Sequence, residues 1–109
     1  MNTVAIVLSV GRDRSEEFER GFREHELPVW EDLHGRGTLL RASLNRLDIT
    51  SHRVDDAQQY LVVAVFAEEE GHHEHDSHPG FRAWDEMAEA YQVAQPLAFG
   101  GDAIIHIGE

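Results

Sequence analysis

The amino-acid sequence predicts an α+β protein in which two helices cover one face of a four-stranded antiparallel sheet. Its 109 residues are about the length of one domain, and residues 1–109 are expected to fold as a single unit. Four short segments have the apolar or alternating pattern of strands, and two longer segments have the periodicity of amphipathic helices. These segments follow one another in the order β-α-β-β-α-β, with no internal repeat or linker between them.

The first predicted strand, residues 3–10, is a short and mostly β-branched apolar run that ends at Gly11. A long amphipathic helix is expected next, over residues 14–34. Four apolar side chains recur there at helical spacing, separated by charged residues: Phe18, Phe22, Val29 and Leu33. Pro28 lacks an amide hydrogen and clashes with the preceding turn, so we expect a kink near residues 24–27.

The second and third predicted strands differ in how they would be buried. Residues 38–47 alternate between apolar and polar side chains, which indicates a strand with one face in solvent. Residues 59–67 are apolar on both faces and form the strongest strand pattern in the sequence. Residues 68–78 are rich in acidic residues and histidine and are expected to form a loop.

A second helix is predicted from Pro79 to about residue 94, because proline favours the first turn of a helix and Asp76 or Ser77 can cap it. Its apolar stripe comprises Phe81, Trp84, Met87, Ala88 and Tyr91. Residues 103–107, AIIHI, are expected to form a short final strand. The complete order is the split βαβ, or ferredoxin-like, arrangement. Right-handed crossovers then give the sheet order 4-1-3-2, with both helices on one face.

Composition and charge exclude several classes of protein. With nine basic and 21 acidic residues the net charge is −12, which disfavours binding to nucleic acid or to anionic membranes. The longest apolar run, residues 60–67, is far shorter than the ~20 residues of a membrane helix. The start of the chain lacks the basic segment of a secretory signal, so a cytoplasmic location is expected. Without cysteine there is no disulfide, thiolate metal site or cysteine nucleophile.

One segment carries a family resemblance. Residues 77–84, SHPGFRAW, open the second predicted helix. Together with the strand order and the chain length, this segment resembles the dimeric α/β-barrel superfamily. That superfamily includes antibiotic-biosynthesis monooxygenases, stress-responsive barrel proteins, muconolactone isomerases and cyclase-like tailoring proteins of pigment pathways.

The resemblance implies a homodimer in which the uncovered faces of two sheets meet. The sequence agrees, because the strands at residues 3–10 and 59–67 are apolar on both faces, whereas a sheet with one solvated face alternates. The resemblance also implies a small hydrophobic molecule bound between the helices and the sheet. Several members of the superfamily need no cofactor, and none is expected here. Others bind haem through a histidine, for which the candidates are His25, His78 and His106.

A histidine-rich segment suggests a metal site. Residues 72–78 contain four imidazoles and two carboxylates, which are ligands for zinc, nickel or copper. The predicted ligands of a divalent metal are His72, His75 and His78, and such a metal would be dispensable for folding. The alternative is a solvated polar loop with a helix cap at its end, because ligands from one short loop rarely converge without outside support.

Three polar residues are candidates for catalysis at a cavity between the sheet and the helices. His25 precedes the expected kink, and His106 lies in the last predicted strand; either could act as a general base. Arg41, on the polar side of the second strand, could hold an oxyanion. The alternatives are an exposed helix histidine, a packed core or interface histidine, and a solvated edge strand. The predicted substrate-binding wall consists of Phe22, Trp30, Tyr60 and Trp84. Core packing is the alternative role for these rings.

These observations favour a small cofactor-independent tailoring enzyme, of the monooxygenase, isomerase or cyclase type, that acts on a hydrophobic aromatic or polyketide-like metabolite. No nucleotide-binding glycine motif, phosphate loop, zinc-protease motif or serine-hydrolase elbow occurs in the sequence, so those chemistries lack support. Two alternatives stay open. One is a noncatalytic dimeric binding or stress-response protein, and the other is a metal-binding protein centred on residues 72–78.

Overall fold

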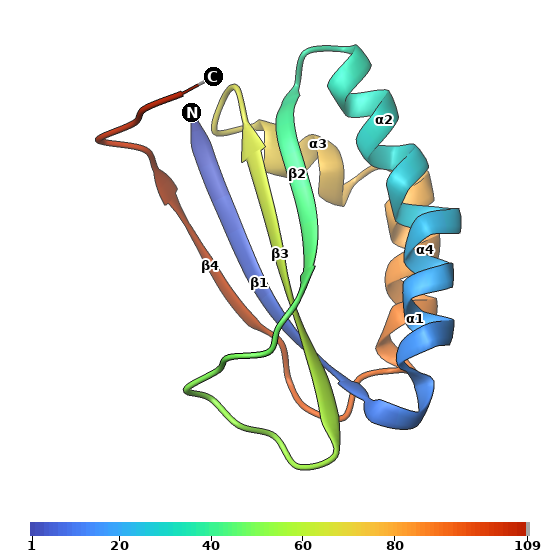
Figure 1. Cartoon of the computed structure of the whole chain (residues 1–109). Helices are drawn as coiled ribbons and strands as arrows, with labels where there is room; N and C mark the ends of the chain where they lie inside the picture. The colour runs from blue at the N-terminus through green and yellow to red at the C-terminus, as the bar shows by residue number, and fades with distance from the viewer. Residues whose placement is uncertain (109) are drawn as a thin grey trace.

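The strands form one antiparallel sheet whose order matches the prediction. The computed structural model describes residues 1–108. Its strands are β1 (Asn2–Gly11), β2 (Leu39–Arg46), β3 (Ala57–Phe66) and β4 (Leu97–Asp102). Hydrogen bonding places them in the order β2-β3-β1-β4, which confirms the ferredoxin-like arrangement. The apolar strands β1 and β3 are the central pair (Figure 1).

The first helical segment is continuous but changes its type along its length. It consists of a 3-10 turn η1 (Arg12–Arg14), α1 (Ser15–Gly21), a π-helical turn η2 (Phe22–Glu26) and α2 (Leu27–Gly35). Leu27 closes the π turn by donating its amide hydrogen to the Phe22 carbonyl oxygen. Pro28 follows in the first turn of α2, where its missing amide hydrogen is tolerated. The irregularity expected before Pro28 is therefore a π turn, through which the helix continues.

The connection after β3 is helical, so the loop predicted at residues 68–78 is wrong. A short helix, α3 (Gly71–Asp76), occupies most of it. Gly71 allows α3 to start directly against β3, because a Cβ atom at this position would lie 2.8 Å from the Phe66 side chain. Six residues are too few to display a helical period, and this is why the sequence pattern does not reveal α3.

The last helix, α4 (Pro79–Glu89), begins at the predicted proline but differs from the prediction at both ends. The Gly80 amide donates to His78 Nδ1 at 3.0 Å, so His78 is the N-cap in place of the two residues expected to cap the helix. After α4 the chain turns, and the Val93 amide donates to the Ser9 carbonyl oxygen at 2.9 Å. Pairing with the end of β1 therefore ends the helix before residue 94.

The final strand lies earlier in the chain than predicted. β4 ends at Asp102, and residues 103–107 are not a strand. Asp102 pairs with Asn2, the first residue of β1, so β4 has no partner beyond this point. Pairing thus overrides the high β propensity of the segment that follows. Its three isoleucines are each at least 90% exposed: Ile104, Ile105 and Ile107.

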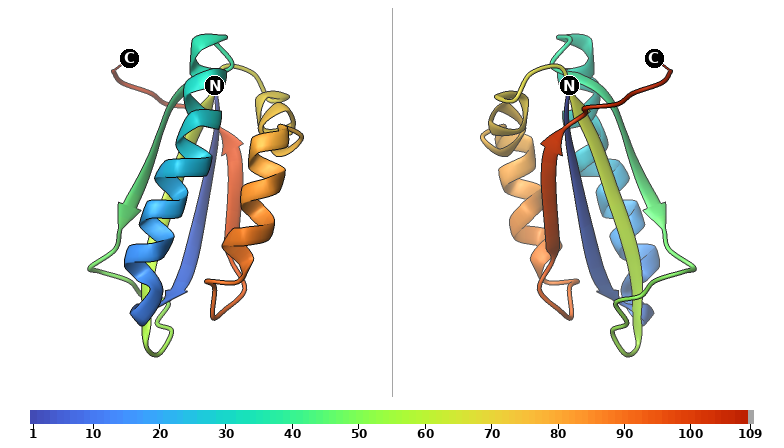
Figure 2. Two further views of the ribbon diagram at one scale, coloured as in Figure 1. Left: turned by 90° about the vertical axis from the view of Figure 1, so that its right-hand side faces the viewer. Right: turned by 90° about the vertical axis from the view of Figure 1, so that its left-hand side faces the viewer.

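The helices all lie on one face of the sheet (Figure 2). The side chains between the two layers form two clusters, one around Phe18 and Tyr60 and one around Leu33 and Phe66. Among residues 1–108, no helix covers the opposite face. Phe99 of β4, which pairs with Ala5, is 62% exposed on that face. Within residues 1–108, every helix is too short or too polar to cross a membrane.

Candidate active site

A cleft of about 400 Å³ lies between the first helical segment and the sheet, beside the edge strand β2. Its lining residues on the helical side are Glu19, Phe22, Arg23, Leu27 and Trp30. Its lining residues on the sheet are Leu44, Arg46 and Tyr60. The cleft therefore occupies the layer in which the sequence predicts a cavity.

A second depression of about 310 Å³ continues along β2. It shares Leu27 and Trp30 with the cleft and extends to Arg41 and Ala42. Because β2 is an edge strand, no further strand of residues 1–108 closes this side of the sheet. The two hollows thus form one groove between α2 and β2.

Aromatic rings form the apolar part of the cleft. Phe22 and Trp30 meet edge to face, with ring centroids 5.1 Å apart and an interplanar angle of 74°. Tyr60 is 1% exposed, and its ring packs on that of Phe18 at 5.0 Å. Phe22 and Tyr60 also belong to the hydrophobic core, so close packing fixes their positions. The cleft therefore offers a preformed apolar surface that suits a planar ring.

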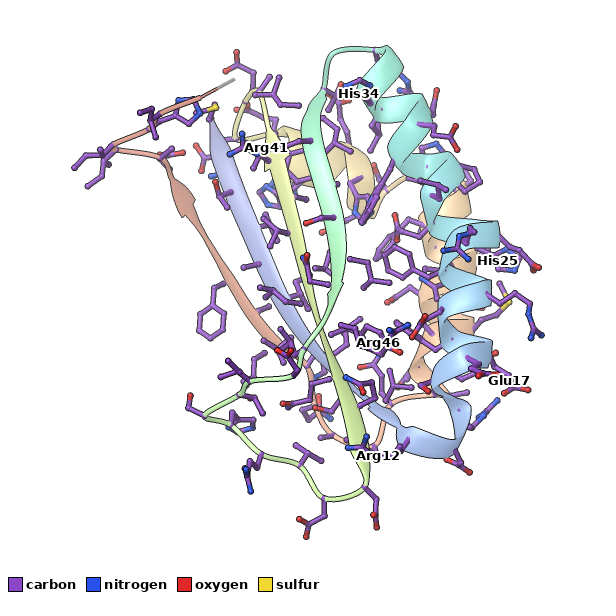
Figure 3. All side chains as sticks on the ribbon, viewed as in Figure 1. Arg12, Glu17, His25, His34, Arg41 and Arg46 are labelled. Atoms are coloured by element: carbon purple, nitrogen blue, oxygen red, sulfur yellow. The ribbon has the colours of Figure 1, made fainter. Side chains whose placement is uncertain are left out.

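The polar part of the cleft is a hydrogen-bonded group of Tyr60, Glu19 and Arg46. The Tyr60 hydroxyl donates to Glu19 Oε2 at 2.6 Å. Arg46 donates to the same carboxylate twice, from Nε to Oε2 at 3.0 Å and from Nη2 to Oε1 at 2.6 Å. Arg46 lies between the sheet and α1 (Figure 3), and its side chain is 62% exposed. The group therefore joins α1, β2 and β3 across the cleft.

These contacts set the protonation states of the group. The hydrogen bonds from Arg46, helped by the Tyr60 hydroxyl, outweigh burial and lower the pKa of Glu19. Burial, followed by the hydrogen bond to the Glu19 carboxylate, raises the pKa of Tyr60 to about 12. Near neutral pH, Glu19 is therefore an anion and Tyr60 is a neutral donor. Neither matches the near-neutral pKa that favours a general base.

Similarity to known proteins is found in the structure and not in the sequence. The sequence matches no family model, and no curated protein matches it significantly. A provisionally assigned antibiotic biosynthesis monooxygenase from Caulobacter crescentus superimposes with a TM-score of 0.76 at 19% identity, covering 95% of this chain and 90% of that chain. SnoaB, a cofactor-independent oxygenase from Streptomyces nogalater, gives a TM-score of 0.66 at 17% identity, covering 99% of this chain and 97% of that chain.

A dimeric ferredoxin-like protein from an uncultured marine organism gives a TM-score of 0.74 at 11% identity, covering 100% of both chains. The chain has the ferredoxin-like fold of these proteins. Identities of 11% to 19% establish this fold, whereas an activity must be argued from the residues of the cleft.

Three of the four rings predicted to contact a substrate line the cleft of this ferredoxin-like domain, namely Phe22, Trp30 and Tyr60. Trp84 does not line it. This residue is 3% exposed and packs in the core against Phe18, with ring centroids 5.9 Å apart. Substrate contact by the three lining rings stays a prediction, while the contacts of Trp84 are those of a core residue.

The three predicted catalytic residues do not come together in the structure. His25 stacks on Trp84, with ring centroids 5.6 Å apart and an interplanar angle of 16°, and it does not line the cleft. Arg41 borders the second depression, but it pairs with Val65, on the sheet face away from the helices (Figure 3). His106 is exposed beyond the end of β4, because the strand predicted to hold it is absent. The catalytic roles of these residues stay predictions, and the charged residues that line the cleft are different ones.

Glu19 and Arg46 are not identified by the sequence reasoning, although the sequence contains a signal for each. Arg46 follows Ala42 and Leu44 at two-residue spacing, so it continues the face of β2 that points to the helices. Glu19 precedes Phe22 by three residues, which places the two side chains on neighbouring parts of one helix surface. No sequence pattern gives their contact, because Glu19 and Arg46 are 27 residues apart.

Two of the histidines in residues 72–78 bind separate carboxylates. His75 Nε2 lies 2.7 Å from Glu26 Oε1. His78 Nε2 lies 2.9 Å from Asp32 Oδ2, while its other ring nitrogen caps α4. His75 in α3 and His78 at the start of α4 thus reach different positions along the first helical segment.

His72 has yet another partner, since its Nδ1 lies 2.7 Å from the Glu69 carbonyl oxygen. Among residues 1–108, no three His, Cys, Asp or Glu side chains are grouped so that they could hold a metal ion. The structure therefore does not support the predicted set of metal ligands, His72, His75 and His78.

The pair of His75 and Glu26 is buried where α3 packs against the π turn η2. Their side chains are 15% and 5% exposed, and the ring centroids of Phe81 and His75 lie 4.2 Å apart. Burial raises the pKa of Glu26 more than the hydrogen bond with His75 lowers it. Burial would lower the pKa of His75, but the bonds to Glu26 and Asp76 outweigh this effect and raise it. The pair therefore retains a proton to a higher pH than a free histidine does. Its hydrogen bond links α3 to the π turn η2, which borders the cleft.

Proposed function

We propose that this chain is a small cofactor-independent tailoring enzyme that binds a hydrophobic, aromatic or polyketide-like metabolite in the cleft. The composition of the cleft carries the proposal: the rings of Phe22 and Trp30 lie beside an ion pair and a tyrosine hydroxyl. Small-molecule sites are typically apolar pockets with a few fixed polar groups. The volume of about 400 Å³ lies within the usual range for such sites.

Oxygenation, isomerisation and cyclisation of such a substrate share one step, the loss of a proton to solvent water that leaves an enolate or phenolate. The guanidinium groups of Arg23 and Arg46 line the cleft and can stabilise that oxyanion. In the oxygenase case the substrate supplies the electrons. A methylene group and dioxygen give a carbonyl group and water, so one oxygen atom is retained and the other leaves with both hydrogens. Support for this class comes from SnoaB, which shares the fold and is a cofactor-independent oxygenase.

An oxygen-uptake assay tests the proposal. The protein is mixed with an anthrone, whose central methylene group is acidic, in the presence of EDTA and without flavin. We expect oxygen uptake and anthraquinone formation above the uncatalysed rate. Trp30→Ala should be slower than Met87→Ala, which removes an exposed apolar side chain outside the cleft. The proposed enzyme fails if no substrate of the three types is turned over, and the proposed aromatic site fails if no aromatic compound binds.

A noncatalytic binding protein is the second candidate, and one observation favours it. The lining of the cleft includes no histidine, its carboxylate is held by Arg46 and its tyrosine has a raised pKa. Such a site can bind an aromatic compound without taking a proton from it. Tight binding without turnover of any substrate type would favour this candidate over the enzyme.

A homodimer is part of the proposal. The face of the sheet without helices carries apolar residues on three strands: Ala5, Val7, Leu61, Val63, Leu97 and Phe99. A second copy of this face is the partner that such a surface fits, and one protein of the same fold is dimeric. A cytoplasmic location, and the absence of nucleic-acid and membrane partners, stay predictions from composition.

A further inference from the structure

The cleft is locally cationic in a protein that is strongly acidic. Two guanidinium groups, Arg23 and Arg46, and one carboxylate, Glu19, line it. Near neutral pH these three groups sum to one positive charge, whereas the whole chain carries −12. A positively charged hollow on a negative surface concentrates anions from solution.

The geometry leaves the charge of Arg23 available to a ligand. Arg23 lies four residues after Glu19, which is the spacing at which the two would normally pair along a helix. Glu19 instead binds both Arg46, through two nitrogens, and the Tyr60 hydroxyl. Within residues 1–108, Arg23 has no carboxylate at ion-pair distance. Arg23 therefore lines the cleft with only a longer-range attraction to Glu19, and its guanidinium group makes no direct ion pair within the described residues.

We propose that the ligand of the cleft is an aromatic compound that carries a negatively charged oxygen, with its rings against Phe22 and Trp30 and its anionic group on Arg23. This inference rests on the proposed function, because it specifies what the same cleft binds. The anionic group is a carboxylate, a phenolate or an enolate, and all three present a charged oxygen to a guanidinium group. Arg46 belongs to the internal ion pair, so Arg23 is the residue that sets the preference for charge.

The same arrangement indicates that the ligand arrives already ionised. Glu19 accepts hydrogen bonds at both of its oxygens, and the Tyr60 hydroxyl already donates its proton to Glu19. Neither group is free to remove a proton from an incoming phenol or acid. A ligand that ionises in solution needs no such base, and it gains the attraction of Arg23 on entry.

Two fluorescent probes with the same ring system test this inference. Anilinonaphthalene sulfonate carries an anionic group, and phenylnaphthylamine is its neutral counterpart. Their affinities are measured for the wild type and for Arg23→Gln. Arg53→Gln is the control, because it removes the same charge from the exposed connection between β2 and β3. Trp30→Ala shows whether a probe occupies the cleft.

We expect the wild type to bind the anionic probe more tightly than the neutral one, with both weakened by Trp30→Ala. Arg23→Gln should weaken the anionic probe roughly tenfold, the effect of one charge-assisted hydrogen bond, and leave the neutral probe unchanged. Arg53→Gln should change neither affinity. If both probes occupy the cleft but Arg23→Gln does not distinguish them, the inference about charge is wrong and the proposed function stands. If neither probe responds to Trp30→Ala, both the inference and the proposed aromatic site are wrong.

Discussion

Tyr60 is the residue that connects the core of the protein to the candidate site. Its ring is 1% exposed and packs on Phe18, while its hydroxyl reaches Glu19 in the cleft. A buried hydroxyl group needs a partner, since leaving it unsatisfied is costly. Glu19 meets that need and is itself held by Arg46. Core packing and the charge arrangement of the cleft therefore depend on each other.

Tyr60→Phe removes the hydroxyl and keeps the ring. We expect the free energy of unfolding to fall by about 1 kcal/mol at neutral pH, the contribution of one hydrogen bond. The pKa of Tyr60 is raised from 10.0 to about 12, so its protonated form contributes stability that is complete below pH 10 and is lost as the pH rises toward 12. Denaturant titrations between pH 10 and 12 should show a smaller decrease in the free energy of unfolding for Tyr60→Phe than for the wild type. Equal decreases would show that ionisation of the hydroxyl is not coupled to folding.

The buried His75–Glu26 pair predicts a pH dependence closer to neutrality. Because the pKa of His75 is raised above 6.5 in the folded protein, its protonation contributes stability that is complete below pH 6.5 and is lost as the pH rises through the raised value. Glu26→Gln removes the strongest cause of that shift and should flatten the pH dependence of the free energy of unfolding. His52→Gln, in the exposed connection before β3, is the control and should retain it. If the free energy of unfolding of Glu26→Gln depends on pH as steeply as that of the wild type, the proposed role of the pair is wrong.

The sequence predicts side chains whose positions depend on hydrophobic packing. It does not predict contacts between polar side chains that are distant in the sequence. Phe22, Trp30 and Tyr60 are predictable because large rings on helix and strand faces must lie between the layers. The sequence does not predict that His25 stacks on Trp84, because the π turn changes the phase of the helix at this position. Glu26 lies in the apolar stripe four residues after Phe22, a position where a carboxylate needs a buried partner, but the sequence does not name His75 as that partner.

At the element scale, the contact between the first helical segment and α4 depends on a glycine. A Cβ atom at Gly21 would lie 2.7 Å from Cζ3 of Trp84, so the indole of α4 occupies the space that a side chain would need. Trp84 is 3% exposed and cannot move outward without opening the core. The close approach of the two helices therefore requires glycine at this position.

Gly21→Ala should destabilise the protein, although alanine has the higher helix propensity. Overpacking of a filled core typically costs about 1–3 kcal/mol, which exceeds the gain of about 1 kcal/mol from propensity. Gly35→Ala is a matched control near the end of α2, because a Cβ atom there would meet nothing within 4 Å. Thermal unfolding of both variants measures the difference. A stabilised Gly21→Ala would show that Trp84 is free to move.

The helices and strands differ in how closely their positions can be predicted from their local sequences. β1 and β3 are long apolar strands and the first helical segment is strongly periodic, so the positions of all three are predicted closely. β4 is misplaced because its sequence, LAFGGD, has low β propensity, and only pairing with β1 makes it a strand. Helix α3 is missed because a six-residue helix is stabilised by tertiary contacts, including the bond from His75 to Glu26.

The sheet has one face that is covered by the helices and one open face. The helices lie over the inner face (Figure 2). Phe99 of β4 is exposed on the outer face, where it pairs with Ala5 of β1. A sheet exposed to water on one face normally carries polar residues there. β1 and β3 instead carry apolar residues on this face, including Val7 and Val63. The dimer proposed above would bury this surface.

Phe99→Asp should shift a dimer toward the monomer, because it places a charge within the apolar surface. Light scattering during size-exclusion chromatography measures the mass of the wild type and the variant. Met87→Asp, which introduces the same charge on the exposed side of α4, should leave the mass unchanged. A monomeric wild type, or a Phe99→Asp variant that is still dimeric, would show that this face is not the interface.

The cleft between the first helical segment and β2 is proposed to bind an aromatic compound. The chain has two tryptophans, one in the cleft and one in the core, so their indole N–H signals provide a probe and an internal reference. Titration with naphthoate in a proton–nitrogen correlation spectrum should shift the indole signal of Trp30 and leave that of Trp84 nearly unchanged. Shifts confined to the open face of the sheet, around Phe99, with Trp30 unaffected would contradict the claim.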